Sequence, residues 1–392
     1  MSLAFSTAGE SHGEGGLAFL DGLPKGLQLD EEFVRGQLRR RQAGYGRGGR
    51  QRLERDEAQF LCGVRRGQTL EAPLAIWIPN RDSRIDTTPD LTRPRPGHAD
   101  LSGCLRHGDR DIRANLERAS ARETAARVAA GAVAQLLLRE IGVEVLGHVV
   151  RIGPVASAGE PGVLVAADAD LAALRGQVEA SDCGVLEAAL EPEMRAAIDA
   201  ARSDRDSLGG CVEVVALGIP AGLGSFAQWD RRLDGRLAQA LMSIQAIKAV
   251  EIGLGVDVGE RRGSAVHDPI EPASGGGYRR PRNRAGGLEG GVTNGAPLVV
   301  RATKKPIATL RRPLRSVDLA TGEAADAAFE RSDVCAVPAA AVIAEAMVAL
   351  VLADAALELF GGASIEAFCA GHVAHAARSA RVVGGASCEG GT

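Results

Sequence analysis

Hydrophobic and polar positions follow a helical rhythm in the segment 120–141. Apolar residues recur there every three or four positions, at Ala121, Ala125, Val128, Ala132 and Leu136. Ser120 and Glu123 form the S-x-x-E capping pattern that precedes a helix. We therefore predict a helix over 120–141, ended by Gly142 and followed by a strand over 143–150.

The rest of the chain alternates between short apolar runs and longer helical stretches. Runs bounded by glycine and proline predict strands at 17–20, 59–63, 72–78, 211–219 and 296–304. Helical spacing predicts a helix over 233–248, helices within the alanine- and acid-rich segment 155–208, and a long helix from Pro338 to Gly361. These elements lack the regular alternation of a doubly wound sheet. The pattern predicts one large mixed α and β domain over residues 1–392.

The most apolar stretch, residues 334–359, is interrupted by Glu345 and Asp354. Such a segment is too polar for a membrane span and is typical of a buried helix. The first residues lack a charged region followed by a long apolar run, so no signal peptide is predicted. Seven scattered cysteines, never in C-x-x-C spacing, argue against a disulfide framework or a zinc site. We expect a soluble, cytoplasmic protein that binds no metal and no membrane.

Composition narrows the class of protein further. The 392 residues are 45% hydrophobic, which excludes disorder for most of the chain, and the 50 glycines do not recur at every third position as in collagen. The formal net charge is −4. Arginine supplies nearly all the positive charge, because lysine occurs only at positions 25, 248, 304 and 305. For most of these arginines we favour the interpretation that they reflect a bias in the base composition of the genome.

Eight arginines lie between positions 35 and 55. Gly44, Gly46 and Gly49 match G-x-G-x-x-G, but they follow a basic helix-like stretch instead of a strand, so no dinucleotide fold is predicted. A nucleic-acid-binding segment is one interpretation, although the negative net charge and the 3% aromatic content weigh against it. Arginines among glycines suit a small polyanionic substrate better, and Arg47 has little to pack against there. A solvated basic face is the alternative for Arg35, Arg52 and Arg55.

Two histidines lie in loops whose composition suggests chemistry. His12 stands in the loop GESHG, and a surface histidine is the alternative there. His98 stands in the loop RPRPGHAD, where two prolines and a glycine fix the backbone and Asp100 is near enough to orient the ring. Histidine exchanges protons near neutral pH, so both are candidate acids or bases. Of the others, His148 is expected in the core with a hydrogen-bond partner, and His372 and His375 in a tail.

Three further segments could hold an anion or a cofactor. The start of the predicted helix, residues 118–123, offers backbone N–H groups and two arginines. The glycine-rich stretch 286–295 and the segment 305–309 could wrap closely around a cofactor. Arg331 and Asp333 precede the long C-terminal helix, where a surface ion pair is the simpler interpretation.

At these motifs the sequence resembles the chorismate synthase family. The motifs occur in the family's order from residue 9 to about residue 358, namely GESHG, RRRQAGYGRGGR, RPGHAD, ERASARETAARVAAGA, GGLEGGVTNG, KPIAT and RSDVCAVPAA. Ser332 stands where several lineages carry histidine, and residues 115–118 replace the family's GGGR. The resemblance implies an α+β fold, a β-α-β sandwich with helices packed between sheets, assembled as a homotetramer.

The resemblance also implies an activity, the conversion of 5-enolpyruvylshikimate 3-phosphate to chorismate and phosphate, the last step of the shikimate pathway. This lyase reaction is an anti-1,4-elimination that requires reduced FMN (FMNH2) without net redox change. The sequence leaves open whether the chain reduces FMN with NADPH or depends on a separate flavin reductase. A nucleic-acid-binding protein and a nicotinamide dehydrogenase are the competing interpretations, but neither accounts for the two framed histidines.

Matching positions give individual residues their implied roles. His12 is the acid that assists phosphate departure, His98 lies beside the flavin and sets its protonation, and Asp333 relays a proton. Ser11 and Ser120 support this network. The implied substrate-binding residues are Arg41, Arg47, Arg50, Arg122 and Arg331. The implied FMN-binding residues are Arg41, Arg47, Ala119, Ser120, Ala121, Gln245, Ala246, Gly290, Lys305, Pro306, Ile307, Ala308, Thr309 and Arg331.

Overall fold

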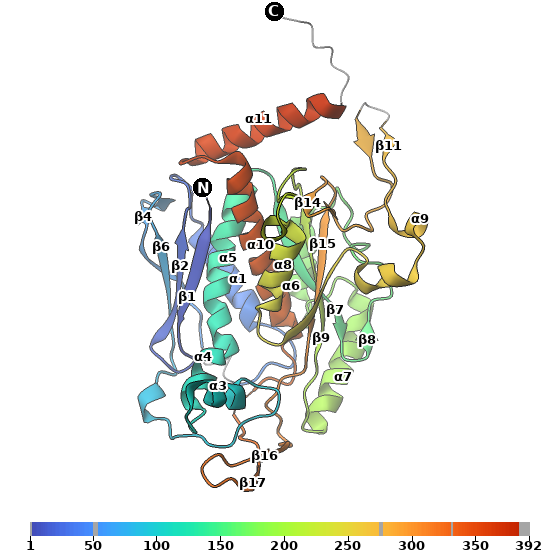
Figure 1. Ribbon diagram of the computed structural model, residues 1–392. Coiled ribbons are helices and arrows are strands. Elements are labelled where there is room, and N and C mark those ends of the chain that lie inside the picture. Colours follow the sequence, from blue (N-terminus) through green and yellow to red (C-terminus); the bar gives the residue numbers. More distant parts are fainter. Residues whose placement is uncertain (1, 50–53, 274–276, 331, 384–392) are drawn as a thin grey trace, which may run out of the picture.

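Two antiparallel sheets enclose a layer of helices (Figure 1). The computed structural model describes residues 2–49, 54–273, 277–330 and 332–383. One sheet is built from the first 80 residues and the other from residues 144–304. The helical layer lies between them, which is the β-α-β sandwich that the resemblance implied.

The first sheet has four strands in the order β1-β2-β6-β3. Their bounds are β1 Ala4–Gly9, β2 Gly15–Asp21, β6 Leu74–Pro79 and β3 Gln59–Cys62. The predicted strands at 17–20, 59–63 and 72–78 are therefore confirmed with shifted ends, while β1 was not predicted. Ala18 and Leu20 of β2 and Ile76 of β6 are fully buried on the face toward the helices, because side chains alternate between the two faces of a strand.

The second sheet has five strands in the order β10-β15-β9-β7-β8. Their bounds are β10 Ile247–Ile252, β15 Leu298–Lys304, β9 Gly210–Leu217, β7 Glu144–Ile152 and β8 Val155–Ala156. Val214 and Val300 join the main core on the inner face. Leu146 and Val215 face a smaller core under α6 (Leu171–Ala180) on the outer face. Because both faces are covered, β9 is buried along its whole length.

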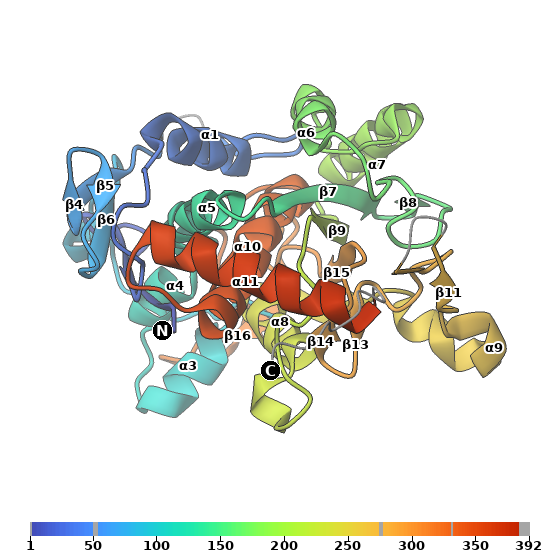
Figure 2. The ribbon, with the colours of Figure 1, turned by 90° about the horizontal axis from the view of Figure 1, so that it is seen from above.

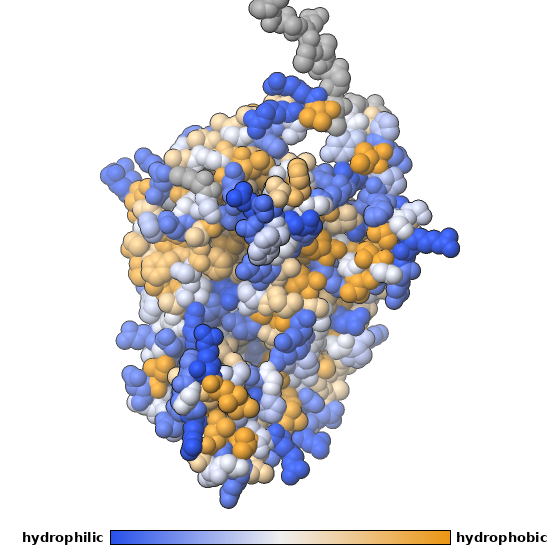
Figure 3. Space-filling view, viewed as in Figure 1, coloured by the Kyte–Doolittle hydropathy of each residue, from blue (hydrophilic) through white to orange (hydrophobic). Residues whose placement is uncertain are grey.

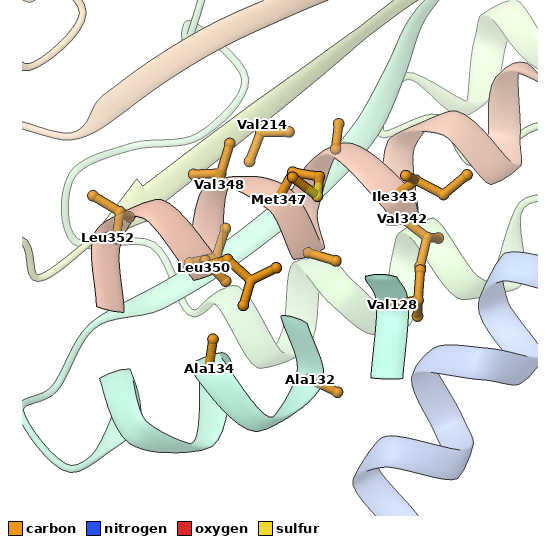
Figure 4. Packing of buried hydrophobic residues seen from close by; sticks show 14 of the residues in the cluster. Val128, Ala132, Ala134, Val214, Val342, Ile343, Met347, Val348, Leu350 and Leu352 are labelled. Atoms are coloured by element: carbon orange, nitrogen blue, oxygen red, sulfur yellow. The ribbon is translucent and has the colours of Figure 1, made fainter. Parts of the chain in front are cut away.

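The helical layer is centred on α5 (Thr124–Arg139) and α10 (Val337–Phe360), with α1 (Glu31–Gln42) and α8 (Leu233–Met242) beside them. α5 packs on β2 and β6, α10 packs on β7 and β9, and the two helices pack on each other (Figure 4). α10 is the one helix in the described part of the chain that is long and apolar enough to cross a membrane. However, 89% of its most apolar window is buried in this core.

The remaining elements cover the edges and ends of the sandwich. α11 (Ile365–Val383) runs across one end of it (Figures 1 and 2). The other helices are α3 Asp100–His107, α4 Arg113–Ala119, α7 Glu191–Ser203 and α9 Gly263–Val266. The small antiparallel pairs are β4 Val64–Arg65 with β5 Gln68–Thr69, β11 Glu271–Pro272 with β12 Tyr278–Arg279, β13 Leu288–Glu289 with β14 Val292–Thr293, and β16 Arg315–Val317 with β17 Ala324–Asp326.

Three sequence predictions need correction. The segment predicted as one helix over 120–141 begins with a 3-10 turn, Ala121–Glu123, before α5, and Glu123 binds Thr7, Arg127 and Gln245 instead of closing a capping box. The helix predicted over 233–248 ends at Met242, because the chain turns through Ala246 at φ +72° into β10. His372 and His375 lie on α11 against the ring of Phe360, not in a tail.

Candidate active site

The loop between β1 and β2 presents Ser11 and His12, and both residues are buried. Nδ1 of His12 lies 2.9 and 3.0 Å from the two carboxylate oxygens of Glu117 on α4. The backbone N–H of His12 donates to the same carboxylate at 2.7 Å. Asn80 donates from its amide nitrogen to the backbone oxygens of Ser11 and Gly13. His12 is thus held rigidly, and the alternative of a surface histidine is wrong.

Two arginines converge on one buried carboxylate near this loop. Arg41 of α1 donates to Oδ2 of Asp56 at 3.0 Å, and Arg122 donates to Oδ1 of the same residue. Arg41 also donates to Thr124 at the start of α5, and Arg122 to the side chain of Asn80. Burial lowers the pKa of Arg41 to about 10, which still leaves it charged at neutral pH. Nη2 of Arg122 also lies 3.9 Å from the buried Glu54, so two carboxylates hold the two guanidinium groups in place.

A third arginine, Arg47, forms an ion pair that joins the glycine-rich loop after α1 to the segment before α10. Nη1 of Arg47 lies 2.6 Å from Oδ2 of Asp333, and the backbone N–H of Gly48 donates to Oδ1 at 2.6 Å. The Arg47 side chain is only 10% exposed, so it is packed and paired, contrary to the expectation that it has little to pack against. Burial and the charge of Arg47 lower the pKa of Lys304 to about 8.

The segments 245–246 and 305–309 meet at this point of the site. Nζ of Lys304 donates to the backbone oxygen of Gln245 at 3.1 Å, and the backbone N–H of Lys305 donates to that of Ala246 at 2.9 Å. The Gln245 amide nitrogen donates to Glu123 at 3.0 Å. Two implied cofactor-binding segments that are far apart in sequence therefore lie side by side, beside the start of α5.

His98 is framed as its loop composition predicted. Nδ1 of His98 lies 2.5 Å from Oδ1 of Asp100, which also accepts from the Arg95 guanidinium. Burial opposes ionisation of Asp100, but hydrogen bonds from His98 and Arg95 outweigh it and lower the pKa of that carboxyl. Arg95 donates to the hydroxyl of Thr309, and Nζ of Lys305 donates to the backbone oxygen of Gly97. The His98 loop and the 305–309 segment are thus joined.

Several polar atoms at these positions have no hydrogen-bond partner within the described part of the chain. These atoms are Nε of Arg47, Nη2 of Arg122 and the side-chain oxygen of Gln245, and all three are buried. Nη2 of Arg122 nevertheless lies 3.9 Å from a carboxylate oxygen of Glu54, so its charge is partly compensated there. The residues that the resemblance assigned to substrate and FMN supply these atoms.

The structure does not gather every predicted residue. Ser120 reaches the site, donating from its hydroxyl to Ser11 at 3.2 Å, and Ala119 and Ala121 flank it. Gly290 lies in the turn between β13 and β14, a hairpin that pairs with Gly224 and with the start of α8. Arg50 and Arg331 lie outside the described residues. A cavity of about 570 Å³ borders the predicted stretch 286–295, but its lining contains none of the implied site residues.

Sequence reasoning missed the carboxylates and the amide that hold the site together. Asp56 and Asn80 lie outside the motifs that were singled out for chemistry, and Glu117 is the first residue of the motif ERASARETAARVAAGA but was given no role. The available signal was indirect, because buried arginines and a buried histidine require buried acceptors. Nothing in the sequence specified which of the 50 acidic residues would serve.

The fold and the site together define a class of protein, a two-sheet sandwich in which carboxylates hold two histidines and several buried arginines near one end of the helical layer. A family model described as chorismate synthase matches residues 3–357. The chorismate synthase of Moorella thermoacetica is 55% identical over 371 residues, 92% of this chain and 94% of that protein. That of Desulforudis audaxviator is 54% identical over 375 residues, 93% of this chain and 94% of that protein.

A solved structure agrees with these relatives. The crystal structure of a chorismate synthase superposes with a TM-score of 0.79 at 42% identity, covering 96% of this chain and 98% of that one. This chain belongs to the chorismate synthase family, which confirms the resemblance and the α+β fold.

Proposed function

We propose that this chain is a lyase that converts 5-enolpyruvylshikimate 3-phosphate to chorismate and phosphate by an FMNH2-dependent anti-1,4-elimination, the last step of the shikimate pathway. The observation that carries the proposal is that two largely buried guanidinium groups each keep one nitrogen, Nε of Arg47 and Nη2 of Arg122, without a hydrogen bond to a described residue, although Nη2 of Arg122 lies 3.9 Å from the Glu54 carboxylate. The substrate carries a phosphate and two carboxylates, and planar guanidinium groups bind such anions bidentately. Arg41, held by Asp56, adds a third cation.

The residues present also fit a flavin mononucleotide. Lys305 to Thr309, Gln245, Ala246 and the start of α5 lie together, and they offer cations, backbone N–H groups and an unpaired amide oxygen. Reduced FMN would supply electron density for phosphate departure and take up the C6 hydrogen, with no net redox change. NADPH, or a separate flavin reductase, would provide the reduced state.

In this proposal the two histidines handle protons. The ring of His12 has Nδ1 occupied by Glu117, and its Nε2 lies 3.8 Å from Asp82, so Nε2 serves as the donor to the leaving phosphate. His98, held by Asp100, sets the protonation of the flavin. Asp333 accepts hydrogen bonds from Arg47 and from the backbone N–H of Gly48, and in this proposal its carboxylate accepts a proton and passes it on.

The competing nucleic-acid interpretation would use the arginines between positions 35 and 55, but several of these are paired within the chain. Of the arginines between positions 35 and 55, Arg39 pairs with Glu32, Arg40 with Glu345, Arg41 with Asp56 and Arg47 with Asp333. Hydrophilic and apolar side chains are interspersed over the face in Figure 3. We therefore propose no nucleic-acid partner.

We further propose the homotetramer that is usual for the family. Phe226 and Trp229 are 82% and 83% exposed in this single chain. Large apolar side chains exposed to this degree are typical of surfaces that a partner covers.

The function is tested by an anaerobic assay of chorismate formation. Enzyme given FMN that was reduced once should perform many turnovers, and the flavin should end reduced. Oxidised FMN should give no product unless the chain accepts electrons from added NADPH, which a parallel reaction with NADPH measures. Consumption of one reduced flavin per chorismate would overturn the elimination mechanism.

A further inference from the structure

Glu117 makes several hydrogen bonds with the His12 loop that the sequence motifs did not predict. Its side-chain oxygens accept from Nδ1 of His12 and from the His12 backbone N–H, and its backbone oxygen accepts from the N–H of Ser11 at 3.1 Å. The residue is 1% exposed. A buried carboxylate is costly unless it is paired, and here the pairing is with one ring and the loop that carries it.

This contact fixes which ring nitrogen faces the reaction. With Nδ1–H donated to Glu117, Nε2 is left pointing away from it, 3.8 Å from Oδ2 of Asp82, which is beyond hydrogen-bond length. A carboxylate bound to one nitrogen of an imidazole also stabilises the protonated ring, because the positive charge is shared between both nitrogens.

We propose that Glu117 is a positioning residue that holds Nδ1–H of His12 on its carboxylate, stabilises positive charge on the ring and directs Nε2–H toward the leaving phosphate. This inference rests on the proposed function for the identity of the proton acceptor. As the C–O bond to phosphate breaks, the bonding electrons stay on the phosphate oxygen and the proton moves to it from Nε2. The ring becomes neutral, and Glu117 keeps its negative charge throughout.

The charges around the ring come from several elements. Glu117 on α4 faces Nδ1, and Arg113, one turn earlier, lies 3.8 Å from the Glu117 carboxylate and 3.3 Å from Glu330. Asp82, in the loop after β6, faces Nε2 and is bound by Arg84 at 2.8 Å. Each carboxylate near the ring thus has an arginine nearby. Glu117 is distinguished by its direct hydrogen bonds to the ring and to the loop.

The state of Glu117 agrees with this role. Burial opposes ionisation, but the hydrogen bonds from the ring and backbone of His12 and the charge of Arg113 outweigh it and lower the pKa of Glu117. The carboxylate is therefore ionised wherever the enzyme is folded near neutral pH. A neutral glutamine of nearly the same shape removes the charge and keeps most of the volume.

The test compares Glu117→Gln with Glu193→Gln, a matched change on the exposed side of α7. Turnover with reduced FMN is followed from pH 5 to pH 9. The high-pH limb of the profile should move about one to two pH units lower in Glu117→Gln, the size expected when an opposite charge within 4 Å is lost. It should not move in Glu193→Gln. Glu117→Asp, which restores the charge, should bring the limb back toward its original pH.

A second readout does not require activity. The ring resonances of His12, assigned by their loss in His12→Gln, are titrated by NMR in the intact protein. Their midpoint should fall by the same one to two units in Glu117→Gln. An unchanged midpoint, or turnover lowered equally at all pH values, would mean that Glu117 only supports the loop and would overturn the inference. If the unaltered enzyme forms no chorismate, the proposed function fails, while the NMR midpoint still decides the role of Glu117.

Discussion

Each of the two predicted histidines shares a hydrogen bond with a buried carboxylate. His12 in the β1–β2 loop meets Glu117 of α4, and His98 meets Asp100 at the start of α3. The two carboxylates differ in what else they hold. Asp100 also binds Arg95 through three contacts, whereas Glu117 has Arg113 at 3.8 Å. The consequences of removing either ring should therefore differ.

We expect His12→Ala and His98→Ala each to lower turnover by roughly 10²-fold or more, as for the loss of a positioned acid or base. The loop composition alone predicts that neither change affects stability. The contacts correct this for His12, because its removal takes the ring donor from the buried Glu117 carboxylate and leaves it the backbone N–H of residue 12, at a cost of about 1–3 kcal/mol. Urea unfolding should show the loss in His12→Ala only. Near-normal activity of either variant would exclude its role in proton transfer.

Arg47→Ala should raise the apparent KM for the substrate, because a charge-assisted hydrogen bond contributes about 1.5–3 kcal/mol. It should also lower the melting temperature, since Asp333 loses the arginine that neutralises it. Arg39→Ala is the matched control, because the side chain of Arg39 is exposed and pairs with the exposed Glu32, and such surface pairs contribute little. An unchanged KM in Arg47→Ala would return this residue to a purely structural role.

At the residue scale, sequence reasoning located the cationic and proton-exchanging groups but not their partners. His98 and Asp100 are two residues apart, so their contact could be predicted from the loop. His12 and Glu117 are separated by 105 positions, and only the packing of α4 against the β1–β2 loop brings them together. The same holds for Arg47 and Asp333, which lie 286 positions apart.

At the scale of the elements, the contact between α5 and α10 limits what can be substituted. A Cβ atom added to Gly131 of α5 would lie 2.3 Å from Cβ of Ala346 in α10. The glycine permits the close approach of these two helices, although it is a poorer helix former than alanine. Alanines flank this contact on both helices, while larger side chains such as Val128, Ile343 and Met347 fill the rest of the cluster (Figure 4).

Gly131→Ala should therefore destabilise the protein by about 1–3 kcal/mol, as expected for overpacking, despite the better helix propensity of alanine. Gly176→Ala in α6 is the matched control. An added Cβ there meets nothing within 4 Å, so the same substitution should stabilise by up to about 1 kcal/mol. Chemical denaturation followed by far-UV circular dichroism measures both. Equal effects of the two substitutions would contradict the close contact.

Strand and helix positions were predictable where hydrophobic spacing was regular, as for α5, α10 and β9. The pattern failed over 233–248, where the spacing continues past Met242 although the chain turns at Ala246. A single residue at positive φ carries that turn, and alanine gives no signal for it. Likewise, β1 has no buried residue along its length, so its sequence lacks the expected apolar run.

At the scale of the whole molecule, one buried charge links the layers. Glu345, in the middle of the apolar α10, accepts from Arg40 of α1 at 2.9 and 3.0 Å, from Arg175 of α6 at 2.7 Å, and from the backbone N–H of Gly147 in β7 at 2.8 Å. Burial opposes its ionisation, but these partners outweigh burial and lower the pKa of Glu345 to about 2. The charge thus connects the helical layer to the second sheet and to its outer cover.

This pKa predicts how stability depends on acid. Because the pKa of Glu345 is lower in the folded than in the unfolded chain, its contribution is complete above about pH 4.5 and is lost as the pH falls toward 2. The contribution is of the order of 3 kcal/mol. Glu345→Gln should weaken the dependence of the urea midpoint on pH in this window, as measured against the unaltered protein. An identical slope in both would contradict the role of this charge.

The position of α10 in the sandwich has a consequence for synthesis of the chain. The first sheet and α5 are complete by residue 139. However, α10 covers the second face of α5, and it also covers the inner face of the second sheet. α10 begins only at residue 337. At translation rates of about 5–20 residues per second, these apolar surfaces stay uncovered for roughly ten seconds or more while the chain is synthesised. Nascent chains halted before α10 should therefore bind chaperones, and the sandwich should close only after nearly the whole chain has been made.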